Sequence, residues 1–219
     1  MTDSSLDGPG QHADQPLVTA GAPAAAADVA VVACHGRGAT AQGMVNLLEP
    51  IYRHGVAFLA PQARHNSWYP RPATAPRAAN EPALSSSVES VEAALESARE
   101  IGIPAERAVF VGFSQGASVV AEFVRRRPGR YGGAFLLSGG IPGGPEDDIA
   151  VRGRLEGTPA FVGYGADDSR IDLERVAETG RALEDAGAEV NERRYPGVGH
   201  EVTDDEFEAL GSLLESLSS

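Results

Sequence analysis

The stretch Ala108-Val109-Phe110-Val111-Gly112-Phe113-Ser114-Gln115-Gly116 decides the fold of this chain. Its first four residues form an apolar run that predicts a buried strand, and residues 117–124 have the spacing of a helix. Between the two, Ser114 has a glycine two positions before it and another two positions after it. A sharp turn from strand to helix brings neighbouring backbone very close, and glycines remove the Cβ atoms that would collide there.

A serine in the pattern G-x-S-x-G between a strand and a helix is typical of the α/β-hydrolase fold. In that fold the turn exposes the serine hydroxyl at the carboxyl edge of the sheet. The main-chain N–H of Gln115 then lies at a helix N-terminus, where it can stabilise a negatively charged oxygen. The sequence therefore predicts Ser114 as a nucleophile and the N–H of Gln115 as one oxyanion donor.

Strand-like and helix-like segments alternate along the rest of the chain. Apolar runs predict strands at 29–34, 56–60, 107–113, 132–138, 159–164 and 189–195, with a short edge strand at 17–19; helices are expected at 42–53, 85–101, 115–127, 172–186 and 203–217. Nearly continuous apolar strands that alternate with helices predict a mostly parallel sheet with helices on both faces.

The length of the chain limits the number of domains. At 219 residues it can form one well-buried α/β domain but not two. Residues 1–16 are polar and have no periodicity, which predicts a disordered N-terminal tail. We therefore expect a tail at 1–16 and a single α/β-hydrolase domain without a large cap at 17–219.

The charge of the chain excludes several classes of partner. All 18 basic residues are arginines, 31 residues are acidic, and the formal net charge is −13. Such a surface repels nucleic acid and anionic membranes. No apolar stretch approaches the roughly 18 to 20 residues that a membrane span needs, and the N-terminus lacks the order of a signal peptide. We expect a cytoplasmic protein with no nucleic-acid partner and no membrane span.

Two explanations of this composition remain open. Arginine in place of lysine fits codon bias in a GC-rich genome. The excess of acidic residues fits adaptation to high salt, where screening reduces repulsion and a carboxylate-rich surface stays solvated. The single cysteine, Cys34, excludes an internal disulfide. Because it lies in the apolar run 29–34, it is predicted to be a small buried side chain rather than a nucleophile.

The base that would activate Ser114 is expected after it in the chain, because this fold has the order serine, acid, histidine. His200 is the only one of the five histidines that follows Ser114. It lies in a glycine-rich segment, 195–200, between the last predicted strand and the last predicted helix. His200 is therefore the predicted base.

The acid that orients the histidine is expected just after the strand at 159–164. Two adjacent carboxylates, Asp167 and Asp168, follow that strand. Because neighbouring side chains in an extended loop point in different directions, only one of them can face His200. The other is expected to be solvated or to cap the next helix.

A second oxyanion donor is expected from the loop after an early strand. The segment His35-Gly36-Arg37-Gly38 directly follows Cys34 and has the form H-G-x-G. Its glycines allow the backbone to turn an amide toward the nucleophile, and that amide would be the N–H of Arg37. His35 is expected to brace the loop through hydrogen bonds.

Together these motifs resemble the phospholipase/carboxylesterase family of small α/β-hydrolases, which includes bacterial carboxylesterases and acyl-protein thioesterases. The resemblance covers about residues 28–217 and rests on H-G-R-G at 35–38, S-W-Y at 67–69, G-F-S-Q-G at 112–116, G-A-D-D at 165–168 and G-V-G-H at 197–200. It implies hydrolysis of a small-molecule ester or thioester without a metal or an organic cofactor. We expect a monomer or a homodimer.

The resemblance also implies roles for individual residues. The family pattern G-x-x-D-P-x-V-P, laid on Gly165, makes Asp168 the catalytic acid, with Ser169 in place of the usual proline. The S-W-[FY] tripeptide implies that Trp68 and Tyr69 line the substrate pocket. The alternative is that Trp68, the only tryptophan, packs its loop onto the sheet.

Three functions follow from these expectations. The leading one is a serine hydrolase that cleaves short- to medium-chain carboxylic esters through an acyl-enzyme intermediate. A thioesterase, a lysophospholipase or another reaction on the same three residues is the alternative. A silent relative that binds a small ligand is the third, although such relatives usually lose the serine or the histidine.

We expect the melting temperature to rise as KCl is increased from about 0.1 to about 3 M, because the screening length falls to roughly 3 Å at 1 M and carboxylate repulsion falls with it. Exclusion of salt from the surface also strengthens the burial of apolar groups. Thermal melts followed by circular dichroism measure this. A gain that continues above about 1 M indicates halophilic adaptation, since screening is by then complete. A flat or falling melting temperature would leave codon bias as the better account.

Overall fold

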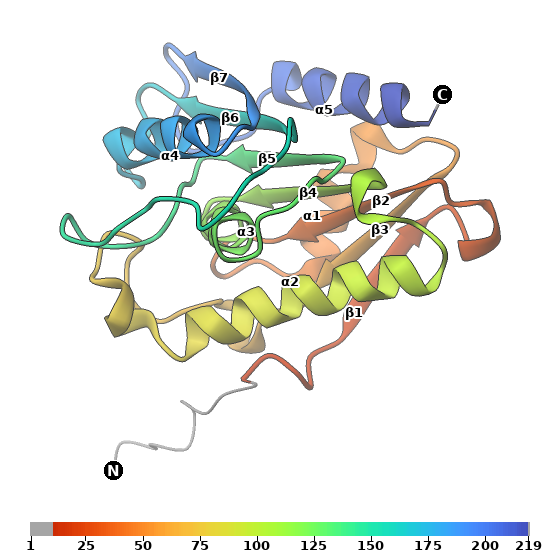
Figure 1. The fold of residues 1–219 in the computed structure, drawn as a ribbon, viewed down its shortest axis with the longest axis horizontal. Coiled ribbons are helices and arrows are strands. Elements are labelled where there is room, and N and C mark those ends of the chain that lie inside the picture. Colours follow the sequence, from red (N-terminus) through yellow and green to blue (C-terminus); the bar gives the residue numbers. More distant parts are fainter. Residues whose placement is uncertain (1–10, 219) are drawn as a thin grey trace.

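The computed structural model describes residues 11–218, which form a seven-stranded sheet in the order β1-β3-β2-β4-β5-β6-β7 (Figure 1). β1 pairs antiparallel with β3, and every other neighbouring pair is parallel. The mostly parallel sheet predicted from the alternation of segments is confirmed. The strands are β1 (Leu17–Gly21), β2 (Val29–Cys34), β3 (Val56–Pro61), β4 (Ala108–Phe113), β5 (Gly133–Leu137), β6 (Pro159–Gly165) and β7 (Glu189–Tyr195).

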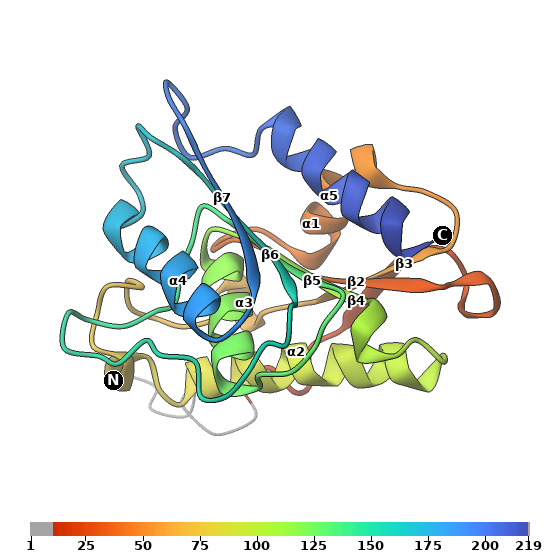
Figure 2. The ribbon, with the colours of Figure 1, turned by 45° about the horizontal axis from the view of Figure 1, so that its top comes forward.

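Within the described residues, five α-helices cover the two faces of the sheet (Figure 2). They are α1 (Ala41–Leu47), α2 (Ala83–Glu100), α3 (Gln115–Arg126), α4 (Leu173–Asp185) and α5 (Asp204–Leu217). α1 and α5 pack on one face, and α2, α3 and α4 pack on the other. Alternate residues of a central strand therefore enter different cores: in β2, Val31 and Ala33 join the α1/α5 side, whereas Val32 and Cys34 join the opposite side.

The helix boundaries follow local chemistry. α1 ends at Leu47, earlier than the predicted residue 53, because Pro50 lacks the N–H that a continuing helix needs; residues 49–51 form a 3₁₀ turn. α4 begins after Asp172, whose carboxylate accepts hydrogen bonds from two amides of the first turn. α5 begins with a capping box between Thr203 and Glu206. These caps hold the ends of the last two helices near the carboxyl edge of the sheet.

Two long connections leave the carboxyl edge of the sheet. Residues 62–82 link β3 to α2 and contain two short 3₁₀ turns, and residues 138–158 link β5 to β6 without a helix or strand. β7 lies at one end of the strand order and is the least buried strand of the sheet, with half or more of its residues exposed. No helix within the described range 11–218 has both the length and the apolar character of a membrane span.

Residues 11–16, which the sequence predicts to be the last part of the disordered tail, pack against the domain. His12 is only 2% exposed. Its main-chain N–H donates to Ser86 Oγ (2.9 Å), its Nδ1 accepts the N–H of Arg64 (3.1 Å), and its Nε2 lies 3.0 Å from the carbonyl oxygen of Trp68. The expected tail residues 1–10 lie outside the described residues.

Cys34 ends β2 and is fully buried, so its thiol is expected to be inert. Burial raises the pKa of Cys34 to about 12. We expect a disulfide reagent at mildly alkaline pH to label Cys34 of the folded protein on the order of 10³-fold more slowly than Cys34 of the chain unfolded in guanidinium, because the thiolate is the reacting form. Absorbance of the released thiolate measures both rates. Rapid labelling of the folded protein would contradict the buried placement.

Candidate active site

The turn between β4 and α3 holds Ser114 in a strained conformation, with φ of 57° and ψ of −119°. The flanking glycines make this turn possible. A Cβ atom at Gly112 would lie 2.3 Å from the carbonyl oxygen of Gly116, and one at Gly116 would lie 2.0 Å from the carbonyl oxygen of Cys34. Neither position can carry a side chain unless the backbone moves, so these two glycines fix where α3 starts.

Three of the side chains proposed from the sequence meet at this turn. His200 Nε2 lies 2.9 Å from Ser114 Oγ, and His200 Nδ1 lies 2.6 Å from Asp168 Oδ2. Because a carboxylate can only accept, Nδ1 carries a proton that it donates to Asp168. Nε2 is then free to accept the proton of the Ser114 hydroxyl. The imidazole packs beside Phe113, with the ring centroids 4.9 Å apart.

Of the two adjacent carboxylates, only Asp168 faces His200. Its side chain is buried, and Oδ1 accepts the main-chain N–H of Arg170 (2.9 Å) while Oδ2 accepts from the imidazole. Asp167 is exposed, and its main-chain N–H donates to the carbonyl oxygen of Val198 (3.0 Å). The alternation of side chains in this loop therefore turns the two carboxylates to different sides.

The segment after β2 runs beside the turn between β4 and α3, as the H-G-x-G motif suggests. A Cβ atom at Gly36 would lie 3.4 Å from the Cβ of Ser114. Gly36 and Arg37 border the same cavity as Ser114 and Gln115. The N–H of Gln115 belongs to the first residue of α3, where no earlier helical turn supplies an acceptor. Both expected oxyanion donors thus belong to residues that border one cavity.

The side chain of Arg37 fastens the loop 62–82. Its guanidinium donates four hydrogen bonds, to Ser67 Oγ (3.1 Å) and to the carbonyl oxygens of Tyr69 (2.8 Å), Pro70 (3.3 Å) and Arg71 (3.0 Å). His35 braces the same region, as expected. Its Nε2 accepts the N–H of Ala63 (3.1 Å), and burial lowers its pKa, which favours the neutral ring.

Trp68 lies in the core rather than in the cavity. It is fully buried, its Nε1–H donates to the carbonyl oxygen of His35 (2.8 Å), and its ring lies between the rings of His12 and His35. Among the described residues, those that border the cavity at Ser114 do not include Trp68. The expected role as a pocket wall is not met, because the ring packs the loop onto the sheet.

Tyr69, the next residue, does border the cavity. Burial raises the pKa of Tyr69 to about 12. The side chain of Gln115 holds both aromatic residues in place: Oε1 accepts the N–H of Trp68 (3.0 Å), and Nε2 donates to the carbonyl oxygen of Tyr69 (2.8 Å). The sequence pattern alone does not indicate that the side chain of Gln115 also holds the aromatic residues in place.

The cavity beside Ser114 has a volume of about 410 Å³. Its walls come from residues 36–39 after β2, 72–74 of the first long loop, 138–140 after β5, and 170–176 around the start of α4. Within residues 11–218, no group of three histidine, cysteine, aspartate or glutamate side chains is placed to hold a metal ion. The groups that meet at Ser114 are a hydroxyl, an imidazole and a carboxylate.

The sequence pattern of the phospholipase/carboxylesterase family matches residues 16–218, which is almost the entire chain. The chain belongs to this family. A family member with a solved crystal structure, the phospholipase/carboxylesterase from Dyadobacter fermentans, is 35% identical with a TM-score of 0.84, and the match covers 94% of this chain and 97% of that one. The α/β-hydrolase fold predicted from the serine motif is confirmed.

Curated relatives in the family carry two kinds of name. The probable carboxylesterase SOBER1-like of Arabidopsis thaliana is 29% identical over 144 residues, which are 66% of this chain and 55% of that protein. Acyl-protein thioesterase 1 of Debaryomyces hansenii is 30% identical over 117 residues, 52% of this chain and 50% of that protein. The matched part of the chain thus spans about half the length of these relatives.

The two aspartates lie in different environments, so substituting each one separately tests which of them is the catalytic acid. We expect Asp168→Asn to lower kcat/KM for an ester by roughly 10³- to 10⁴-fold, because the imidazolium loses its partner and the ring can adopt the wrong tautomer. Asp167→Asn removes the same charge from an exposed position and should change kcat/KM by less than about threefold. Steady-state kinetics on both variants decide the assignment, and the reverse order of losses would place the acid at Asp167.

Proposed function

We propose that this chain is a serine hydrolase that cleaves carboxylic esters through an acyl-enzyme intermediate. One observation carries the proposal: an unbroken hydrogen-bonded series from Asp168 through His200 to Ser114, with distances of 2.6 and 2.9 Å, at the wall of a cavity. This is the arrangement in which a weak serine nucleophile is activated by a base that an acid orients. Membership of the family supports the same activity.

In the proposed acylation step, Ser114 Oγ attacks the ester carbonyl carbon as its proton passes to His200 Nε2. Asp168 stabilises the imidazolium that forms. The carbonyl oxygen becomes an oxyanion, and the proposed donors to it are the main-chain amides of Arg37 and Gln115. The tetrahedral intermediate then collapses: the bond to the alcohol oxygen breaks, and His200 returns the proton to the leaving alcohol.

Deacylation repeats these steps with water as the nucleophile. His200 takes a proton from a water molecule, whose oxygen attacks the acyl carbon held on Ser114. The second tetrahedral intermediate releases the carboxylic acid, and the proton on His200 returns to Ser114 Oγ. Apart from the ester and one water molecule, no group outside the chain is needed to balance either step, so the proposal requires no cofactor.

The proposed substrates are small esters with a short- to medium-chain acyl group. A volume of about 410 Å³ is within the range of pockets that hold small molecules. Thioester hydrolysis is the second candidate, because relatives at 30% identity are named acyl-protein thioesterase 1 and the same three side chains can cleave either bond. A silent ligand-binding role has less support, since the serine, histidine and aspartate all lie within hydrogen-bonding distance.

We expect Ser114→Ala to lower ester hydrolysis by about 10³-fold or more, because only the oxyanion donors and substrate binding then remain. The change removes one hydroxyl from the wall of the cavity, so the melting temperature should stay close to that of the wild type. Initial rates on p-nitrophenyl butyrate and on a butyryl thioester measure the loss and compare the two candidate activities.

A fluorophosphonate probe provides an independent readout of the nucleophile. Mass spectrometry should find the phosphonyl group on Ser114 of the wild type, and no other serine should be labelled at the same rate. Retention of more than about a tenth of the wild-type rate in Ser114→Ala would reject Ser114 as the nucleophile, since a missing nucleophile costs far more than tenfold.

A further inference from the structure

A second, larger groove borders the catalytic cavity. Its volume is about 790 Å³, and it runs between residues 145–153 of the loop 138–158 and the outer face of α4. Among the described residues, only Asp172 and Arg175 border both the groove and the cavity. The groove and the cavity therefore adjoin at these two residues.

Of these two residues, Arg175 spans the gap between α4 and the loop. Its Nη2 donates to the carbonyl oxygen of Gly144 (2.8 Å), and its Nη1 lies 3.4 Å from Glu178 Oε2 on the next turn of α4. Its side chain is only 14% exposed. Asp172 is occupied at the start of α4, where its carboxylate caps the helix. Of the two residues, Arg175 is thus the one whose side chain ties α4 to the loop.

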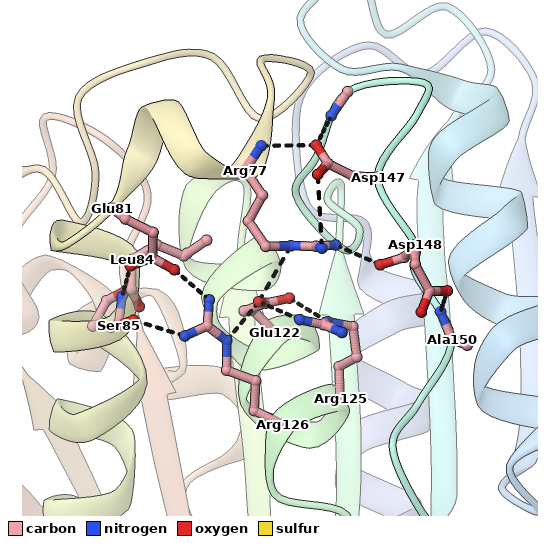
Figure 3. A network of polar contacts seen from close by, with 12 residues as sticks. Arg77, Glu81, Leu84, Ser85, Glu122, Arg125, Arg126, Asp147, Asp148 and Ala150 are labelled. Carbon is pink, nitrogen blue, oxygen red and sulfur yellow. Dashed lines mark hydrogen bonds and ion pairs between the residues drawn. The ribbon is translucent and has the colours of Figure 1, made fainter.

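The acceptor that Arg175 contacts is itself held in place. Asp147 Oδ2 accepts the N–H of Gly144 (2.8 Å) and the N–H of Arg77 (2.7 Å). The Arg77 guanidinium lies between the two long loops, as Figure 3 shows: Nη2 donates to the carbonyl oxygen of Asp148 (2.9 Å), and Nε lies 3.5 Å from Glu122 Oε1. Position 144 therefore cannot move without disturbing this network.

The inner end of the network is a buried carboxylate. Glu122 on α3 is fully buried, and it also pairs with Arg125 and Arg126, whose Nε atoms each lie 2.7 Å from its oxygens (Figure 3). A buried charge that loses its partners is strongly destabilising, so these contacts resist displacement. The two loops also meet directly, because the N–H of Gly143 donates to the carbonyl oxygen of Ala73 (2.7 Å) at the cavity wall.

We propose that the side chain of Arg175 is a partition between the catalytic cavity and the outer groove, and that it thereby limits the length of the substrate group held in the cavity. This inference rests on the proposed ester hydrolysis. A group that fits within the cavity contacts its walls, whereas a longer apolar chain must displace a guanidinium that is already hydrogen-bonded to Gly144. Displacement would strand buried polar atoms, which offsets what the first few added methylene groups gain. The preferred substrates are therefore esters of short acids.

The test compares p-nitrophenyl esters from acetate to dodecanoate on the wild type and on Arg175→Ala. Truncation to alanine joins the cavity to the outer groove, and each further buried methylene group is then worth roughly fourfold in binding. Burial of only two of the six additional methylene groups would give roughly sixteenfold, so we expect the ratio of kcat/KM for decanoate to kcat/KM for butyrate to rise about tenfold or more. A gain on long esters cannot result from partial unfolding, so the expected result is separate from a loss of stability.

Two control variants are used. One tests whether the effect is specific to position 175, and the other distinguishes the volume of the Arg175 side chain from its charge. Arg181→Ala makes the same substitution on the same helix at a residue that borders only the outer groove, and it should leave the ratio within about twofold of the wild type. Arg175→Met removes the charge but keeps most of the side-chain volume, so it should raise the ratio less than Arg175→Ala does.

The outcomes are distinguishable. An unchanged or lower ratio in Arg175→Ala, or an equal rise in Arg181→Ala, overturns the partition and leaves the hydrolase proposal intact. Failure of the wild type to cleave any ester in the series, together with no labelling of Ser114 by a fluorophosphonate, overturns the proposed function and the partition with it. A rise confined to Arg175→Ala, with a smaller one in Arg175→Met, supports the assignment.

Discussion

The close approach of α3 to β2 is the constraint on which the site depends. Gly116 lies so near the end of β2 that even one additional carbon atom would meet the Cys34 carbonyl oxygen at 2.0 Å. Because the helix starts against this strand, its first amide and the loop after the strand border one cavity together with Ser114. A single steric condition in the backbone thus brings the nucleophile and both expected oxyanion donors together.

The aromatic loop is built around the same turn. Gln115 is the first residue of α3, and its side chain holds the backbone of Trp68 and Tyr69 with two hydrogen bonds. Each such bond contributes about 1 kcal/mol, so the loop is positioned by the sum of this pair and the four bonds from Arg37. The aromatic loop is therefore held in place by the same end of α3 at which the nucleophile lies.

Much of this architecture could be predicted from the sequence because it rests on local patterns. The strand, the G-x-S-x-G turn and the helix after it are contiguous, and the order of Ser114 and His200 along the chain follows from the fold. Trp68 was harder to place, since a tripeptide motif fixes its neighbourhood but not the direction of its ring. His12 was missed because its partners are 52 to 74 residues away in the chain. The Arg175 partition likewise arises only when two distant segments meet.

The exposed edge of the sheet has a consequence for how the molecule meets other copies of itself. β7 ends the sheet with the sequence E-V-N-E-R-R-Y, and four of these seven side chains are charged. Charged side chains on an edge strand disfavour the addition of a strand from another molecule, since ladder formation would crowd and desolvate them. Growth of the sheet into larger aggregates is therefore opposed at this end.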